Sequence, residues 1–336
     1  MKNSIELTAE NQEVKGKSNV VVALLKRSDT SVIVATLVLF IVFAIGSSSF
    51  LSSYNLFNVF RTTSLYMFVA LGQAIVLVIG GMNLSLGAIG GLAVVTAGVA
   101  MDTWGLPWWM GIILAIIVGA LAGFINGIFI VRFKLNSFVV TLASSFIFTG
   151  LVFGISKGYP YTGIPKGFTL MGRDGFLGIP YLFWLMIVTL FVLWYVFKYT
   201  VIGRQILATG GNIVAARYSG IKTDRIILLG NVLSGVFAAV AGLLWISRMG
   251  SATPATGSDW MIISFAVAVI GGTALSGGAI SAIGLGTAAL MIALINNGLI
   301  MLGANVYFEQ SFLGVIIMLA VLAESFRMKL HSSRKR

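Results

Sequence analysis

The sequence has 336 residues, of which 58% are hydrophobic and only 10% are charged, and its mean hydropathy is +1.01. A soluble domain carries about 25% charged residues, and it cannot hide this much apolar surface. The composition therefore predicts an integral membrane protein. The net charge of +12 is explained first by membrane topology, which leaves no need for a nucleic-acid partner.

Two residue counts limit the chemistry that the chain can perform. It has no cysteine, and its one histidine, His331, lies in a polar tail. These counts exclude disulfides, thiol nucleophiles, Cys- or His-based metal sites and Ser-His-Asp triads. We expect no catalytic residue and no metal site, and a membrane enzyme is the weakest of the alternatives.

The chain divides into two tails and a membrane domain. Residues 1–30 are polar and lack the apolar core of a signal peptide, so we expect a cytoplasmic tail there. A transmembrane domain is expected at 31–326 and a basic cytoplasmic tail at 327–336. The fold predicted is an all-α polytopic bundle of about ten transmembrane helices.

The ten spans are predicted from uncharged stretches, because a helix needs about 20 apolar residues to cross the hydrocarbon. In chain order the spans are about 31–49, two between 61 and 102, then 102–132, 134–157, 174–198 and 225–248, two between 259 and 309, and about 311–326. Only 14 residues separate Glu309 from Glu324, which makes the tenth span the shortest.

The distribution of charge supports this count and orients the chain in an inner membrane. With the N-terminus in the cytoplasm, ten spans leave 17 of the 22 Lys and Arg residues inside. The five that remain outside are Arg61, Lys157, Lys166, Arg173 and Arg248. This segregation follows the positive-inside rule and predicts two cytoplasmic termini.

Glycine occurs in two kinds of place. Gly119, Gly123 and Gly127 share one face of the fourth span, which favours close approach to another helix. Glycine-rich breaks at 80–87 and 271–278 each interrupt a long apolar run. Each break either lines a water-filled cavity or forms a tight turn at the cytoplasmic surface, and the residues alone leave both interpretations open.

Two pairs of similar motifs favour an internal duplication without fixing its geometry. The breaks share the pattern I-G-G-x-x-L-S-x-G, as a parallel repeat would, whereas Asn126-Gly127 and Asn297-Gly298 lie at opposite ends of their spans, as an inverted repeat would. Polar residues in the spans are amides and hydroxyls, which suit a neutral hydroxylated solute. No carboxylate lies in mid-span, which argues against proton- or sodium-coupled transport.

The longest cytoplasmic connection, 199–225, contains a predicted helix. Asn212 is a good N-cap and Gly220 a good helix stop, so we expect about two helical turns between them. A short capped helix bearing Arg217 and Tyr218 suits contact with a soluble partner, and an ordinary interfacial helix is the alternative.

Four motifs resemble the permease subunits of ATP-driven ABC importers for simple sugars, the ribose-type family. They are A-T-G-G-N-x-x-A-A-R-x-S-G-I at 208–221, G-G-M-N-L-S-L-G at 80–87, G-G-T-x-x-x-G-G from Gly271, and N-N-G-L at 296–299. The resemblance covers about residues 55–325. Asn83 stands where the family has Asp, and Met261 stands where an acidic residue is frequent, so these departures bear on substrate identity.

The resemblance implies a type II-like importer permease that dimerises, as a homodimer or with a related permease, around a central path. It implies a cytosolic ATPase partner, which binds ATP and Mg, and a periplasmic or lipid-anchored sugar-binding protein. Coupling to the ATPase is expected at Gly203, Arg204, Gly210, Gly211, Asn212, Ala215, Ala216, Arg217, Ser219 and Gly220. The path or gate is expected at Asn83, Ser85, Asn126, Asn296 and Asn297.

The sequence itself lacks the G-x-x-x-x-G-K-[ST] phosphate loop, so no cofactor is expected in this chain and energy must come from a partner. The predicted function is import of a monosaccharide such as ribose. A passive sugar or polyol facilitator that works without partners is the alternative.

Overall fold

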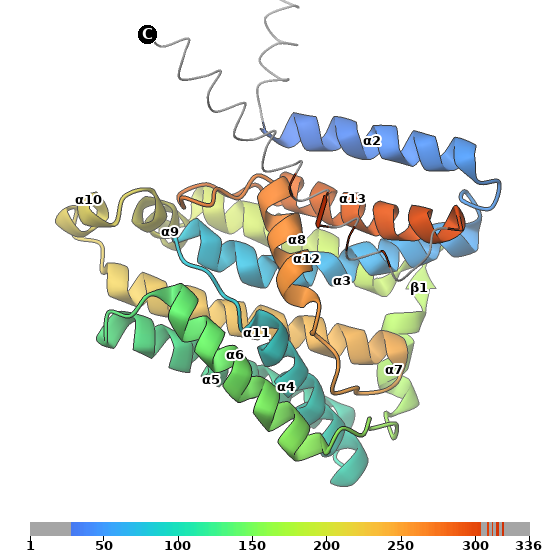
Figure 1. The fold of residues 1–336 in the computed structure, drawn as a ribbon, viewed down its shortest axis with the longest axis horizontal. Helices are drawn as coiled ribbons and strands as arrows, with labels where there is room; N and C mark the ends of the chain where they lie inside the picture. Colours follow the sequence, from blue (N-terminus) through green and yellow to red (C-terminus); the bar gives the residue numbers. More distant parts are fainter. Residues whose placement is uncertain (1–27, 304–307, 309–310, 312–313, 316–317, 319–336) are drawn as a thin grey trace, which may run out of the picture.

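The computed structural model describes residues 28–303 and five positions beyond them, 308, 311, 314–315 and 318. This part of the chain is a helical bundle (Figure 1). The long elements are α2 (Ser28–Gly46), α3 (Ser53–Val78), α4 (Leu86–Gly98), α5 (Trp108–Arg132), α6 (Ser137–Ser156), α8 (Tyr181–Tyr199), α11 (Thr223–Met249), α12 (Trp260–Ile270) and α13 (Ala282–Met301). Shorter elements are the π-helical turn η1 (Val99–Thr103), α7 (Lys166–Arg173), α9 (Val201–Gly211) and α10 (Ile213–Tyr218).

The predicted all-α bundle is confirmed, and nine of the ten predicted spans coincide with apolar helices. Seven helices in the described part of the chain are long and apolar enough to cross a membrane, with α4 and η1 counting as one. The apolar part of α2 and the 11-residue α12 are shorter. Most of the tenth predicted span, most of residues 1–30 and the tail 327–336 lie outside the described residues.

One small departure from the all-α prediction is a two-stranded hairpin. Strands β1 (Gly175–Phe176) and β2 (Ile179–Pro180) pair antiparallel, with Phe176 opposite Ile179. The hairpin closes because Leu177 and Gly178 both take a positive φ. It occupies the first residues of the predicted span 174–198, so the helix α8 begins only at Tyr181.

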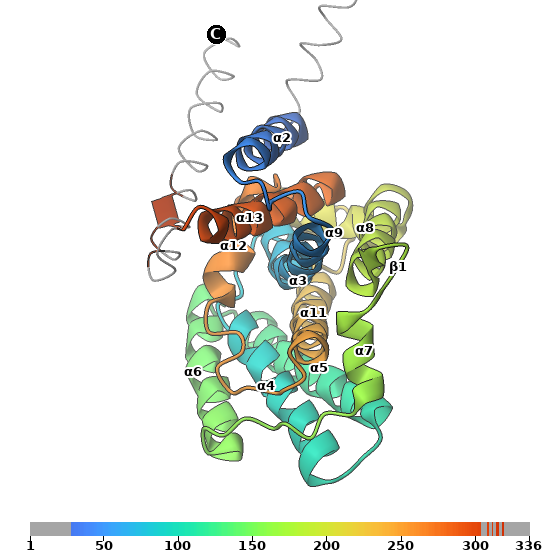
Figure 2. The ribbon, with the colours of Figure 1, turned by 90° about the vertical axis from the view of Figure 1, so that its right-hand side faces the viewer.

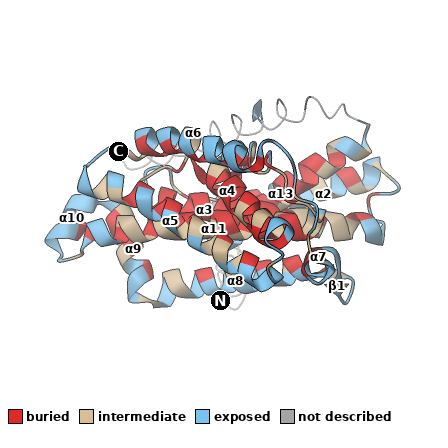
Figure 3. Cartoon of the chain, turned by 90° about the horizontal axis from the view of Figure 1, so that it is seen from below, coloured by how far each residue is buried: buried red, intermediate tan, exposed pale blue. Residues whose placement is uncertain are grey.

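The core of the bundle forms around α3 and α11. In the most apolar 18-residue stretch of α3, 89% of the residues are buried, whereas in that of α8 only 17% are buried. Figure 3 shows the buried residues along α3, α4 and α11, with exposed residues on α6 and α8. Exposed faces of α6 and α8 carry large apolar side chains such as Phe146, Ile147 and Phe191, which suits contact with lipid.

The glycines of α5 allow it to pack closely on α11, as their spacing predicts. A Cβ on Gly119 would lie 2.7 Å from the Ala239 Cβ, and one on Gly123 would clash with the backbone of Asn231. Gly235 on α11 makes the reciprocal approach to Gly119. Small residues at such a crossing let two backbones approach each other, and the resulting van der Waals packing favours helix association in lipid.

Both predicted glycine breaks are present, between α3 and α4 and between α12 and α13. Gly80 has φ +86° and Gly277 has φ +85°, a backbone conformation that residues other than glycine seldom adopt. Figure 1 places α9 and α10 at one end of the bundle and α7 with the hairpin at the other, which is the end that faces the viewer in Figure 2. The first of these ends contains the breaks.

Candidate functional site: a short helix beside two glycine breaks

The connection between α8 and α11 folds into two consecutive helices. The Thr200 hydroxyl caps α9 by accepting a hydrogen bond from the Gly203 amide at 3.1 Å. Asn212 caps α10, and its Oδ1 accepts from the amides of Val214 and Ala215 at 3.1 and 3.0 Å. This confirms the predicted N-cap, and Gly220 follows the helix with φ +83°. The helix α9 was not predicted.

The helix α10 projects from the end of the bundle (Figure 1). Tyr218 is 90% exposed, and Ile213 and Val214 are also exposed. Large apolar side chains on a projecting polar end of a membrane protein are a typical contact surface for a soluble partner.

Arg217, one of the predicted coupling residues, forms hydrogen bonds and an ion pair with neighbouring residues of the same chain. Its guanidinium Nη2 donates to the Thr223 hydroxyl at 3.2 Å and to the Asp224 carboxylate at 3.1 Å, so it ties α10 to the start of α11. Both charged side chains remain more than half exposed, so the ion pair is of the weak surface kind.

Backbone contacts join α9 to both glycine breaks. The Gly278 amide donates to the Val78 carbonyl at 2.8 Å, which links the second break to the end of α3. A Cβ on Gly210 would clash with that carbonyl and lie 2.7 Å from the Gly278 nitrogen. A Cβ on Gly277 would lie 2.6 Å from the Gly210 carbonyl oxygen and 3.0 Å from the Gly80 nitrogen. Three segments far apart in sequence therefore meet without side chains between them.

The first break leads into a fully buried hydrogen-bond network. The Asn83 Nδ2 donates to the Ser234 hydroxyl at 2.8 Å, and its Oδ1 accepts from the Ser85 hydroxyl at 2.7 Å. Asn126 Nδ2 donates to the same Ser85 hydroxyl at 2.8 Å. The network connects the break to α5 and α11, and all four side chains have no exposed surface.

A small cavity of about 150 Å³ lies near the end of the bundle that carries α9 and α10. Its lining includes Gly80 and Gly81 of the break, Asn231 of α11 and Ile213 of α10. The Oδ1 atoms of Asn231 and Asn126 have no hydrogen-bond partner in the structure. A cavity of this size can hold an ordered water, which would satisfy the Asn231 atom on its lining.

The two other predicted path residues lie elsewhere. Asn296 Nδ2 donates to the Tyr66 hydroxyl at 2.8 Å, and Asn297 exchanges amide hydrogen bonds with Asn55 at 2.7 and 3.1 Å. Asn297 also lines a cavity of about 630 Å³ with Arg61 and Arg248 at the opposite end from α10. The five predicted path residues thus form two groups, Asn83, Ser85 and Asn126 in one, and Asn296 and Asn297 in the other.

A third cavity, of about 320 Å³ and lined by both polar and apolar side chains, was not predicted from the sequence. Its lining includes Gly87, Ser145 and Thr149 of α6, and Met261 of α12. Ser145 and Thr149 are four residues apart and share one face of α6, a signal that a search for polar stripes would find. The connection 250–259 closes this cavity, because Gly257 packs directly on Gly87.

No three His, Asp or Glu side chains gather into a possible metal site in the part of the chain that the structure describes. The arrangement offers backbone contacts, amides and hydroxyls, which are groups that can form hydrogen bonds with a neutral polar solute.

The chain is similar in sequence to known transport proteins. The family model described as "Branched-chain amino acid transport system / permease component" matches residues 55–321. The ribose import permease protein RbsC of Bacillus subtilis (strain 168) is 38% identical over 290 residues, which cover 85% of this chain and 89% of that protein.

The RbsC protein of Escherichia coli (strain K12) is 32% identical over 87% of this chain and 92% of its own length. The galactose/methyl galactoside import permease protein MglC of the same organism is 31% identical over 88% of this chain and 93% of its own length. No solved structure matches the chain significantly.

Proposed function

The chain belongs to the branched-chain amino acid transport system permease family, and we propose that it moves a monosaccharide such as ribose through the membrane. It is the multi-pass permease subunit of an ABC importer, and ATP is hydrolysed by another subunit. We propose a monosaccharide because the chain is similar, over most of its length, to permeases named for ribose and galactose.

The proposed docking site for the ATPase is the segment 203–221. Support comes from the projection of α10, the exposure of Tyr218, and the contact of Gly210 with both breaks. When the ATPase changes state, it moves α9 and α10, and the backbone contacts transmit that movement to 78–81 and 277–278. The sugar path then opens to one side or the other as the populations of the two conformations shift.

The proposed orientation places this segment, and both termini, in the cytoplasm. The positive-inside distribution of Lys and Arg supports this orientation. A binding protein would then deliver sugar at the end formed by α7 and the 630 Å³ cavity. A second permease copy or a related permease completes the transporter in this proposal.

The proposed path passes the buried network of Asn83, Ser85 and Asn126. We expect Asn83→Leu to reduce uptake by at least about tenfold, because it leaves the buried hydroxyls of Ser234 and Ser85 with fewer partners, at a cost of about 1–3 kcal/mol. The chain should still copurify with its ATPase. Thr36→Val removes a buried hydroxyl of α2 and serves as the control. Normal uptake by Asn83→Leu would remove Asn83 from the path.

Reconstitution tests the function as a whole. The purified chain in liposomes should give no flux of radiolabelled ribose by itself. Addition of the ATPase, the binding protein and ATP should give uptake against a gradient, and a non-hydrolysable ATP analogue should not. Ribose flux through the chain alone would instead establish the passive facilitator.

A further inference from the structure

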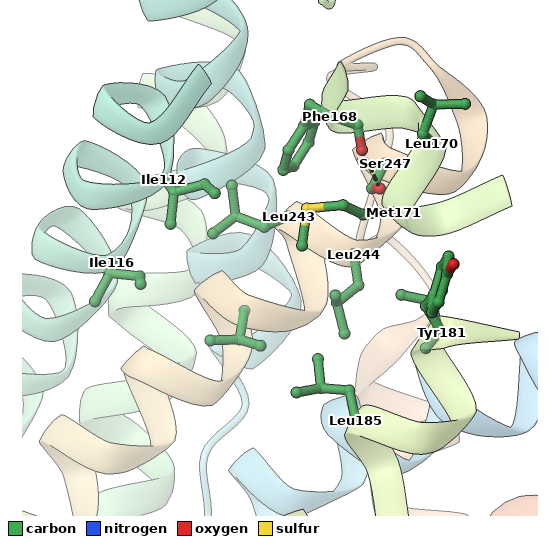
Figure 4. A pocket seen from close by; sticks show the side chains of 12 residues that line it. Ile112, Ile116, Phe168, Leu170, Met171, Tyr181, Leu185, Leu243, Leu244 and Ser247 are labelled. Atoms are coloured by element: carbon green, nitrogen blue, oxygen red, sulfur yellow. Dashed lines mark hydrogen bonds between the residues drawn. The ribbon is translucent and has the colours of Figure 1, made fainter. Parts of the chain in front are cut away.

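An apolar groove of about 520 Å³ separates α8 from α5 and α11, with α7 across its end (Figure 4). The side chains that line it are hydrocarbon or thioether, apart from the hydroxyl-bearing Tyr181 and Ser247. The Ser247 hydroxyl donates to the Phe168 carbonyl at 2.7 Å, so it is already satisfied within the protein. The Ser247 proton is therefore not available to water or sugar in the groove, and an apolar occupant fits the mostly hydrocarbon lining best.

Burial shows that the groove is open on one side. Phe168, Leu182 and Leu243 form a buried floor, each no more than 5% exposed. Leu170 and Leu185 form a rim that is about half exposed. The walls α5, α8 and α11 are all helices of membrane-spanning length, so the medium outside the rim is lipid hydrocarbon.

The helix α7 and the aromatic residues place the groove beside a membrane surface. In Figure 1, α7 lies at the end of the bundle, across the ends of the spans rather than along them. Trp108 at the start of α5 stacks on Phe168 with ring centroids 6.3 Å apart, and Tyr181 and Trp184 begin α8. Tyr and Trp gather at the membrane interface, so the groove extends from the interface into the leaflet next to α7.

Two cations lie at the two ends of α7. Arg173 is committed to the protein, because its guanidinium donates to the carbonyls of Arg248 and Met249 at 3.1 and 2.8 Å. Lys166 makes no ion pair with any residue that the structure describes, and it lies four residues before Leu170 of the groove rim, on the same face of α7. A lysine at this depth extends its ammonium into the headgroup region, where it attracts an anion.

We propose that the groove is a binding site for an anionic phospholipid: one acyl chain fills it, and the headgroup phosphate lies at Lys166. The lipid fills the space between α8 and the α5–α11 pair and so holds α8 in place. The site is independent of the sugar path, because none of its lining residues belongs to the buried network or to the contact between α9 and the breaks.

Photo-crosslinking to the full chain in vesicles tests this site. Phosphatidylcholine vesicles would carry a trace of phosphatidylglycerol with a diazirine in its acyl chain, and adducts would be mapped by mass spectrometry. We expect adducts on the peptides of Leu243 and Leu185 to exceed those on Phe146 and Ile147 several-fold, because the latter two are exposed on α6 without a groove. Equal labelling of both regions, or crosslinking of the groove to a second protein copy, would overturn the proposal.

Two variants separate the acyl and headgroup parts. Leu244→Trp fills the groove and should abolish its adducts, whereas Ile147→Trp should not. Lys166→Glu, on the surface, should leave the chain folded and reduce labelling by phosphatidylglycerol about fivefold relative to a phosphatidylcholine probe. Groove labelling that survives Leu244→Trp, or a headgroup preference unchanged in Lys166→Glu, would contradict the assignment.

Discussion

Gly210→Ala is expected to reduce ATP-driven sugar uptake by at least about tenfold, because overpacking a close contact costs about 1–3 kcal/mol. The new methyl group would clash with the Val78 carbonyl and approach the Gly278 nitrogen to 2.7 Å. Backbone at both positions cannot rotate away as a side chain can, so α9 must move off the glycine breaks. The measurement is initial uptake of radiolabelled ribose in cells that express the complete importer.

Gly150→Ala is the control for this prediction. It places the same methyl group on α6, outside the segment 203–221, where nothing lies within 4 Å. We expect Gly150→Ala to transport normally and Gly210→Ala to insert in the membrane in normal amounts, with ATP hydrolysis no longer stimulated by the binding protein. Equal transport by the two variants would show that contact between α9 and the breaks carries no coupling.

Arg217→Glu is expected to abolish ATP-dependent uptake while leaving the chain inserted. The substitution reverses the charge on the projecting helix and puts a second carboxylate beside Asp224, which replaces an ion pair by repulsion. Loss of an exposed ion pair costs about 0–1 kcal/mol, too little to unfold the bundle. Uptake, and ATPase activity in the presence of binding protein, are the measurements.

A charge swap distinguishes docking from local structure. Arg217→Glu combined with Asp224→Arg restores an ion pair between α10 and α11 but leaves a carboxylate at position 217. If Arg217 contacts the ATPase, the double variant remains inactive. Recovery of uptake in the double variant would limit Arg217 to holding α10 in place.

The helix α10 and the two breaks could be predicted because their signals are local. An Asn side chain that caps the following amides and paired glycines that interrupt an apolar run are visible within a few residues. The helix α9 was missed because two consecutive glycines, Gly210 and Gly211, suggest a loop. In the structure they are the last two residues of this helix, and the Thr200 hydroxyl caps its first turn.

The meeting of α9 with both breaks could not be predicted from the sequence. It depends on backbone atoms of residues 78, 210 and 278, which carry no side-chain pattern. The shared Asn-Gly motif was similarly uninformative about position: Asn126 joins the buried network, whereas Asn297 pairs with Asn55 in another part of the bundle. Tertiary packing, rather than the motif, decides where each amide lies.

Side-specific labelling tests the central claim, that a motor subunit in the cytoplasm acts on 203–221. The chain has no native cysteine, so single substitutions give clean signals. Tyr218→Cys on α10 and Leu177→Cys on the hairpin replace residues that are 90% and 78% exposed at opposite ends of the bundle. A membrane-impermeant maleimide should label Leu177→Cys in intact cells and Tyr218→Cys only after the membrane is opened. Labelling of Tyr218→Cys in intact cells would place α10 outside, beyond the reach of any cytosolic ATPase.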